Sequence, residues 1–276
     1  MIRRDVSISL EATSPEEARA AIDAHQLSLD WSGDSFMAHL WLDATHRTIC
    51  VDGEPVGVAG WTADESPYLS LLTLDRRAIA LDRQVMEVVL DESGARTAYL
   101  ASWDAHHVTT FGAYATGVGS QAYQFRLPDP GDLREPVPGL EITLATHADL
   151  DYLHSTGWQS DFASYVEKSA MSIARLEGRE VGIAVHERHA LDSGVVDIGM
   201  YVDPVLRRHG VGSSILSLTA RAVRDAGLTP VAGCWWKNWS SRATLEAAGL
   251  VCAGTILRFD LDPDVFVRAS SDGGDP

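Results

Sequence analysis

The sequence is poor in cysteine and contains no long hydrophobic run. Its three cysteines, Cys50, Cys234 and Cys252, lack the paired spacing of a metal site. An odd number of cysteines without a secretory segment is typical of reduced thiols in the cytosol. No apolar run approaches the roughly 20 residues that a membrane span requires, and the N-terminal stretch MIRRDVSISLEATSPEE becomes acidic too early for a signal peptide. The sequence therefore predicts a cytoplasmic protein with no membrane partner.

Positive charge is also scarce. The 276 residues contain 22 Lys and Arg against 39 Asp and Glu, which gives a formal net charge of −17. Nucleic-acid binding requires a cationic face that displaces counterions, so this balance argues against a nucleic-acid partner. It favours a cationic or amine-bearing small molecule, although net charge mainly reports on solubility.

Proline is concentrated in one place. The stretch LPDPGDLREPVPG, Leu127–Gly139, holds four of the chain's 11 prolines, and proline fixes φ and removes a backbone donor. The sequence thus predicts one domain over residues 1–127, a proline-rich linker over 128–139, and a second domain over 140–276 that ends in a disordered acidic tail.

The two halves share an order of sequence segments. Three segments of the N-terminal half match three of the C-terminal half, namely Gly53–Trp61 with Gly178–Glu187, Tyr68–Arg77 with Val195–Arg208, and Thr97–Leu127 with Pro230–Leu261. This order predicts an internal structural repeat, and the alternative is two unrelated α/β halves. The strand-like and helix-like patterns predict an α/β fold, specifically an α+β mixed sheet with flanking helices. The sheet is expected to be partly parallel where the helix at 213–226 crosses between strands.

The segment RRHGVGSS, Arg207–Ser214, joins a predicted strand to that helix. Gly210 and Gly212 allow backbone N–H groups to turn inward without obstruction from a Cβ. The helix start near Ser213 adds unpaired N–H donors and a positive end. Together these features predict a nest for a pyrophosphate, although the segment has neither a P-loop ending nor the spacing of a dinucleotide-binding loop. The alternative is a plain strand-to-helix turn that uses glycine for tightness.

Two motifs together resemble the GNAT N-acetyltransferase superfamily. R-x-x-G-x-G at Arg207–Gly212, after a strand that ends in V-x-P at Val202–Pro204, is similar to the family's acyl-CoA-binding motif. A second segment resembles the family's N-x-x-S…E-x-x-G-F pattern and consists of Asn238, Ser241, Glu246 and Gly249–Leu250. The resemblance covers residues 141–261, and the N-terminal half resembles a degenerate copy because its turn at 74–82 has no glycine. Two tandem GNAT-like domains with one active site, in the second, are therefore expected.

The resemblance implies transfer of an acetyl group from acetyl-CoA to a primary amine of a small-molecule acceptor by direct attack. In the family, the strand before the loop diverges from its neighbour and exposes backbone groups to pantetheine, while loop amides hold the pyrophosphate. The implied cofactor-binding residues of this sequence are Met200, Tyr201, Val202, Arg207, Arg208, His209, Gly210, Val211, Gly212, Ser213, Asn238 and Ser241. Asn238 and Ser241 are equally suited to capping the helix that follows them.

Attack requires an uncharged amine, so the site needs a group that accepts a proton. Asp197 occupies roughly the place where some relatives carry a base glutamate. An exposed aspartate with a pKa of about 3.9 is a poor base, so burial would have to raise its pKa; the alternative is a salt bridge at a strand edge. His186 and His189 are further candidates, because imidazole titrates near neutral pH, unless they lie in a solvated hairpin loop.

Many relatives carry a tyrosine that protonates the leaving thiolate, and Leu245 stands at that position. The proton donor is therefore unassigned, and Cys234 fits a core position better than this role. The departure keeps open a second interpretation, a non-catalytic acyl-CoA-binding or sensing protein; a third is a structural protein that retains the fold alone. The pair His106–His107 lacks a third ligand, so no metal is expected.

Aromatic residues gather around Asn238. The candidate acceptor-binding residues are Trp235, Trp236 and Trp239, which would make cation–π or stacking contacts with the acceptor or, alternatively, pack between the two halves. Trp158 and Phe162 would form an opposite wall or belong to the core. The sequence identifies neither the acceptor nor the oligomeric state.

Overall fold

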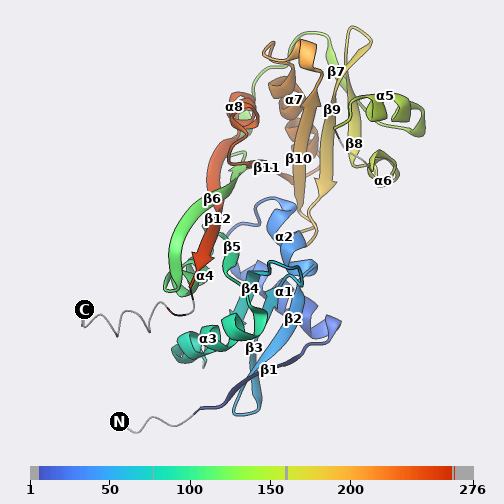
Figure 1. The fold of residues 1–276 in the computed structure, drawn as a ribbon. Helices are drawn as coiled ribbons and strands as arrows, with labels where there is room; N and C mark the ends of the chain where they lie inside the picture. Colours follow the sequence, from blue (N-terminus) through green and yellow to red (C-terminus); the bar gives the residue numbers. More distant parts are fainter. Residues whose placement is uncertain (1–5, 77, 159–160, 263, 265–276) are drawn as a thin grey trace. The chain divides into compact units, whose positions relative to one another are not determined.

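The structure is a computed structural model that describes residues 6–76, 78–158, 161–262 and 264 (Figure 1). Its elements fall into two compact units. Most of the predicted acidic tail lies outside the described residues. Within the described ranges no helix is long and apolar enough to cross a membrane.

The two halves of the chain contain the same succession of elements. The N-terminal succession is β1 (Ile8–Ala12), α1 (Pro15–Ser28), α2 (Ser35–Leu42), β2 (Thr45–Val51), β3 (Glu54–Trp61), β4 (Tyr68–Leu74), α3 (Asp82–Ser93), β5 (Thr97–Ala101), α4 (Ala105–Gly112) and β6 (Ala115–Arg126). The C-terminal succession is β7 (Leu140–Leu144), α5 (Leu150–Ser155), α6 (Phe162–Glu167), β8 (Met171–Leu176), β9 (Arg179–Arg188), β10 (Val195–Val202), α7 (Val211–Asp225), β11 (Thr229–Trp235), α8 (Trp239–Ala248) and β12 (Val251–Leu261). The predicted repeat and the mixed α/β class are thereby confirmed.

The first unit is a mixed sheet in the order β1-β2-β3-β4-β5-β12. Neighbours are antiparallel except for β4 and β5, which are parallel. Helix α3 packs its buried face on this sheet through Val85, Met86, Val89 and Leu90. Helix α1 begins at a capping box, in which Ser14 Oγ accepts from Glu17 N at 3.2 Å and the Glu17 carboxylate accepts from Ser14 N at 3.0 Å. The cap and Pro15 in the first turn fix where α1 starts.

The second unit is a sheet in the order β6-β11-β10-β9-β8-β7, in which only β10 and β11 are parallel. Alternate residues of β10 point to opposite faces. Val196 and Ile198 pack against α7, while Tyr201 packs with the core that α5 and α6 share with the sheet (Figure 1). The sheet therefore lies between α7 on one face and α5 and α6 on the other.

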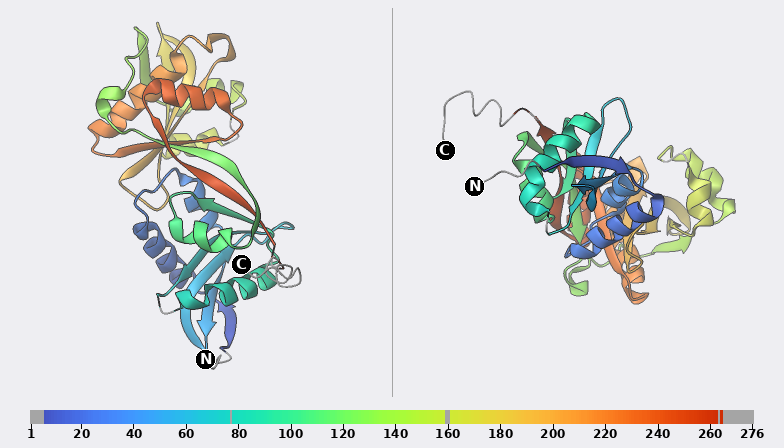
Figure 2. Two further views of the ribbon diagram at one scale, coloured as in Figure 1. Left: turned by 90° about the vertical axis from the view of Figure 1, so that its left-hand side faces the viewer. Right: turned by 90° about the horizontal axis from the view of Figure 1, so that it is seen from below.

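The last strand of each repeat, β6 or β12, begins in one unit and ends in the other. Residues 122–126 of β6 pair with β11 in the second unit, whereas Ile256–Asp260 of β12 pair with β5 in the first. β6 and β12 are hydrogen-bonded neighbours, visible as the two long green and red strands in Figure 2. The predicted division at 127 and 140 thus differs from the observed units, which are residues 1–31, 36–121 and 255–276, and residues 32–35 and 122–254. A repeat in the sequence fixes the order of strands but not the sheet that each strand joins.

The proline-rich stretch is part of the second unit rather than a free linker. Leu133 is buried in the core formed by α7 and α8. Arg134 N donates to Ala248 O at 3.2 Å, and Val137 N donates to Ser214 Oγ at 3.0 Å. Proline limits regular hydrogen bonding within the stretch, so its backbone is held by neighbouring helices instead.

Candidate active site where strands β10 and β11 diverge

The parallel strands β10 and β11 pair over only three residues. The register runs from Val195 opposite Thr229 to Asp197 opposite Val231 and ends there, although β10 continues to Val202 and β11 to Trp235. On its other side β10 stays paired with β9 as far as Val202. After Asp197 the edge of β10 that faces β11 therefore has no strand paired with it, and an extended ligand can hydrogen-bond there as an added strand.

A turn at the end of this open edge leads into α7. Arg208 has φ +68° and Gly210, the N-cap residue, has φ +81°. These left-handed conformations reverse the chain after the 3-10 turn Pro204–Leu206. No side chain caps the start of α7, so the first-turn amides from Val211 to Ser213 depend on another acceptor. A helix start of this kind can bind an anion, and the pyrophosphate nest expected from the sequence stays a prediction.

Packing explains both glycines of the turn. A Cβ on Gly210 would lie 2.9 Å from Nη2 of Arg134, and a Cβ on Gly212 would lie 3.0 Å from Cγ2 of Thr244 on α8. Gly210 also requires glycine-like φ. Both glycines are therefore required by the tight turn itself, which was the alternative interpretation. This structural role is compatible with anion binding.

Arg134 adds a cation at the same helix start. Its Nη1 donates to Ser213 Oγ at 3.2 Å, and its guanidinium lies against Gly210. In the described part of the chain no carboxylate forms an ion pair with Arg134, and its side chain is exposed. Sequence reasoning missed this residue because it lies in the stretch predicted to be a linker.

The predicted rim arginines differ in their surroundings. Arg207 folds back onto β10, where its Nε donates to Val202 O at 3.1 Å and its guanidinium lies 5.9 Å from the ring centroid of Tyr201. Arg208 and His209 are exposed. Of the predicted pantetheine strand, Met200 and Val202 pack toward α7, and Tyr201 lies on the other face.

Asp197 lies at the point where the two strands separate. Its side chain is partly buried, and its Oδ2 accepts from Ser35 N at 3.3 Å. Burial raises the pKa of Asp197 well above its usual value, and the nearby Asp34 and Glu187 carboxylates raise it further, against the lowering effect of the Ser35 amide. The salt bridge that the sequence allowed as an alternative does not form, since no cation pairs with Asp197 within the described residues. A raised pKa makes a carboxylate a stronger proton acceptor than an ordinary exposed aspartate.

Two more acidic residues face Asp197. Glu187 is its direct cross-strand neighbour on β9, so both side chains leave the same face of the sheet. Asp34 lies against Gly233 of β11, where any Cβ would overlap its Oδ2, and its backbone N donates to Gln124 Oε1 at 2.7 Å. The position of Glu187 opposite Asp197 could have been predicted from the spacing of the β9–β10 hairpin. The proximity of Asp34 could not, because Asp34 is distant in the sequence.

The two candidate histidines lie elsewhere. His186 is on the α7 face of β9, opposite to that of Asp197, and its Nε2 is 2.9 Å from Ser172 Oγ. His186 and Ser172 line a cavity of about 780 Å³ between the sheet and the C-terminal half of α7. None of the predicted cofactor residues lines this cavity. His189 is buried, and its Nδ1 accepts from Leu191 N and Asp192 N in the β9–β10 loop. It orders a hairpin rather than lying in solvent.

Residues of the second motif have clear local roles. Asn238 is the N-cap of α8, and its Oδ1 accepts from Ser241 N at 3.1 Å. Leu245 is buried in the core between α7 and α8 and offers no hydroxyl. Cys234 belongs to the same core, and burial raises its pKa to about 11. The capping interpretation of Asn238 and the core interpretation of Cys234 are both confirmed.

The aromatic residues split between core and surface. Trp235 and Trp239 are more than half exposed. Lys237 places its ammonium 5.6 Å from the ring centroid of Trp235 and 4.9 Å from that of Trp236, so these rings already contact a cation of the chain itself. Of the proposed opposite wall, Phe162 is fully buried and Trp158 stacks at 5.9 Å on Tyr201.

Comparison with known proteins identifies the fold. No family model and no curated protein sequence matches the chain. Among solved structures, it is similar to a GNAT-family acetyltransferase from Colwellia psychrerythraea with a TM-score of 0.80 and 14% identity, over 93% of this chain and all of that one. It is also similar to a GCN5-related N-acetyltransferase from Sphaerobacter thermophilus with a TM-score of 0.55 and 14% identity, over 91% and 94% of the two chains. A tandem GNAT protein from the clavulanic acid biosynthesis pathway has a TM-score of 0.50 at 12% identity, over 92% and 98%. The chain therefore has the tandem GNAT acetyltransferase fold.

Proposed function

From this fold, we propose that the second unit is an N-acetyltransferase that moves an acetyl group from acetyl-CoA to a primary amine of a small cationic acceptor. One arrangement supports this proposal. The open edge of β10 runs from the partly buried carboxylate of Asp197 to the start of α7 at Gly210, where an anion would bind. A thioester at one end of that edge and a pyrophosphate at the other match the two ends of the acetyl-pantetheine arm.

The proposed cofactor contacts follow from the open edge of β10 and the start of α7. Backbone groups of Met200–Val202 would pair with the pantetheine amides, as in strand addition. The amides from Arg207 to Ser213 would hold the pyrophosphate together with the guanidinium of Arg134. Asn238 and Ser241, at the start of α8, would border the cofactor while keeping their capping bond. No metal takes part in this proposed reaction.

The chemistry is a direct transfer. The ammonium of the acceptor gives one proton to Asp197, directly or through water, and the neutral nitrogen attacks the thioester carbonyl carbon. The new C–N bond forms as the C–S bond breaks. The nitrogen loses its second proton to solvent, and the leaving thiolate takes a proton from solvent, since Leu245 offers none. Asp197 then releases its own proton to solvent, so that one proton is released per acetyl group transferred. The acidic residues Asp34, Asp197 and Glu187 favour a cationic acceptor on this face.

Arg134→Ala should weaken acetyl-CoA binding about 10- to 100-fold, because a charge-assisted hydrogen bond contributes roughly 1.5–3 kcal/mol. Calorimetry measures this loss, and binding of pantetheine, which lacks the pyrophosphate, should not change. Arg224→Ala is the matched control, because it removes the same charge from the last turn of α7, at the opposite end of the helix from the turn. Equal losses in both variants would contradict a specific role for Arg134.

Glu187→Gln should raise KM for a cationic acceptor about tenfold and leave the acetyl-CoA Kd unchanged, because one of the carboxylates that attract the ammonium is neutralised. It should also shift the acidic limb of the kcat profile to lower pH, since Glu187 raises the pKa of Asp197. Glu180→Gln is the control, because Glu180 lies at the other end of β9 and pairs with Arg175 at 3.6 Å. An unchanged KM in Glu187→Gln would remove this carboxylate from acceptor recognition.

A second candidate function is non-catalytic binding of acyl-CoA. The buried Leu245 favours it, because no hydroxyl replaces the tyrosine that donates a proton in relatives. Acetyl-CoA binding without thiol release, across a broad panel of amines, would select this alternative. Thiol release with any amine would reject it.

A further inference from the structure

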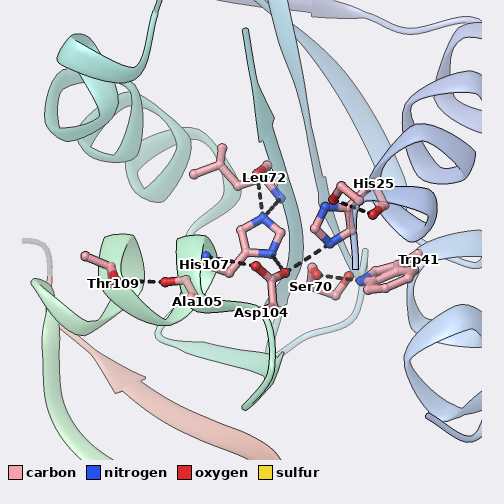
Figure 3. Close-up of polar contacts among 9 residues, drawn as sticks. His25, Trp41, Ser70, Leu72, Asp104, Ala105, His107 and Thr109 are labelled. Atoms are coloured by element: carbon pink, nitrogen blue, oxygen red, sulfur yellow. Dashed lines mark hydrogen bonds and ion pairs between the residues drawn. The ribbon is translucent and has the colours of Figure 1, made fainter. Parts of the chain in front are cut away.

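Three side chains of the first unit converge in a region that the proposed acetyl transfer does not use (Figure 3). His25 lies in the last turn of α1, Asp104 is the N-cap of α4, and His107 lies in the first turn of α4. Their side chains are 9%, 5% and 1% exposed. One donor atom from each lies within 4.8 Å of the other two. Sequence reasoning paired His107 with His106, but consecutive residues of a helix point in different directions.

Asp104 uses its two carboxylate oxygens differently. Its Oδ1 accepts from His107 N at 3.2 Å and so caps α4. Its Oδ2 is in contact with His107 Nδ1 and lies 3.0 Å from His25 Nε2. The cap fixes the direction of the carboxylate, which places Oδ2 between the two imidazole rings.

His107 contacts Leu72 through Nε2 and Asp104 through Nδ1. Its Nε2 lies 2.5 Å from Leu72 O and 3.1 Å from Leu72 N, so this nitrogen can either donate to the carbonyl or accept from the amide. In the tautomer that donates to Leu72 O, Nδ1 presents a lone pair beside Asp104 Oδ2. A cation between Nδ1 and Oδ2 would then join these two atoms.

His25 supplies a further donor nitrogen. Its Nε2 is buried and makes no hydrogen bond of acceptable geometry within the described residues, despite its proximity to Asp104 Oδ2. A buried polar atom without a partner is costly, so the site gains stability from any cation that joins all three donors.

We propose that His25 Nε2, Asp104 Oδ2 and His107 Nδ1 bind a divalent transition-metal ion of the zinc class. Two imidazoles and one carboxylate form a donor set that Zn²⁺ prefers, with bonds of about 2.0–2.2 Å. The bond from His107 Nε2 to Leu72 O is the outer-shell contact that orients a histidine ligand. Three protein ligands leave a fourth position for water. The site lies in the unit that lacks the glycine turn, and its proposal does not depend on the acetyltransferase proposal.

The test uses the full chain without a histidine tag, stripped with a chelator and dialysed. Titration with Zn²⁺ in a calorimeter should show one ion per chain. Co²⁺ should give visible d–d bands without a thiolate charge-transfer band in the near ultraviolet, because no cysteine is among the ligands. Zn²⁺ should also raise the Tm, since it binds the native state preferentially.

Two variants and one control locate the ion. His25→Gln and Asp104→Asn should each lower Zn²⁺ affinity at least about 100-fold and abolish the Tm increase. Asn at 104 retains a capping oxygen for α4. His106→Gln is the control, because His106 is exposed, its ring centroid lies 5.8 Å from that of His107, and it is outside the three-donor cluster. It should bind Zn²⁺ as the natural sequence does.

Absence of stoichiometric Zn²⁺ binding to the natural sequence, or undiminished binding in both variants, would overturn the proposal. The three side chains would then form a proton-bridged network. If neither variant folds, the Co²⁺ spectrum of the natural sequence decides: octahedral-type weak bands or a thiolate band would contradict the assigned ligands.

Discussion

Gly210→Asp is expected to reduce acetyl-CoA binding at least about 100-fold, whereas Gly210→Asn retains measurable binding. Both side chains have nearly the same shape, and Asn and Asp are the non-glycine residues best tolerated at the φ of +81° found here. Only the aspartate places a negative charge where the pyrophosphate would sit, and only it pairs with Arg134, whose Nη2 would lie 2.9 Å from the new Cβ.

Calorimetric titration with acetyl-CoA measures this difference, and chemical denaturation supplies the control. The free energies of unfolding of the two variants should agree within about 1 kcal/mol, because an acidic N-cap is compatible with a helix start. Equal affinities of the two variants for acetyl-CoA would show that the glycines only turn the chain. The turn before α7 would then have no role in anion binding.

Asp197→Asn is expected to lower kcat about 10²- to 10⁴-fold and to leave the Kd of acetyl-CoA unchanged, because it removes the proton acceptor without altering the open edge of β10. The control is Asp203→Asn, which changes an equivalent side chain just after β10, where Asp203 Oδ1 accepts from the Tyr152 hydroxyl at 3.5 Å. Stopped assays of thiol release give kcat for each variant. Full activity in Asp197→Asn would exclude this residue as the base.

The raised pKa of Asp197 predicts opposite effects of pH on activity and stability. Activity requires the carboxylate, so kcat of the natural sequence should fall as the pH decreases through the raised pKa. Stability behaves in the reverse way, because a raised pKa in the folded state favours the protonated form. This contribution is full below the unfolded pKa of about 3.9 and is lost as the pH rises through the folded pKa. Asp197→Asn should therefore raise the Tm at pH 7.5 and leave it unchanged below about pH 4.

The features that the sequence predicts correctly are local ones. The turn at Arg207–Gly212 follows from glycine geometry and the helix start, and the repeat follows from matched segments of strand and helix. The strand pattern places Asp197 on β10, while its role as the base comes from the resemblance to relatives and stays a prediction. Each of these needs only residues that are near one another in the chain.

The features that the sequence does not predict depend on distant contacts. The last strands of the two repeats are exchanged, since β6 pairs with β11 and β12 pairs with β5. This exchange leaves the alternation of apolar and polar residues in each strand unchanged, so the sequence pattern does not reveal it. Arg134 reaches the helix start of α7 from a stretch whose prolines indicate a linker. Asp34 joins Asp197 only because the segment 32–35 packs in the second unit. The pKa of Asp197 depends on that packing and therefore requires the structure.

Release of CoA thiol from acetyl-CoA on addition of small amines distinguishes an acetyltransferase from a protein that only binds acyl-CoA. The panel should contain monoamines, diamines and amines with a further cationic group, with the Asp197→Asn variant alongside. We expect thiol release with at least one cationic amine, dependent on Asp197, and stoichiometric formation of the acetylated amine. A folded protein that binds acetyl-CoA but releases no thiol above the Asp197→Asn background with any amine would contradict this expectation.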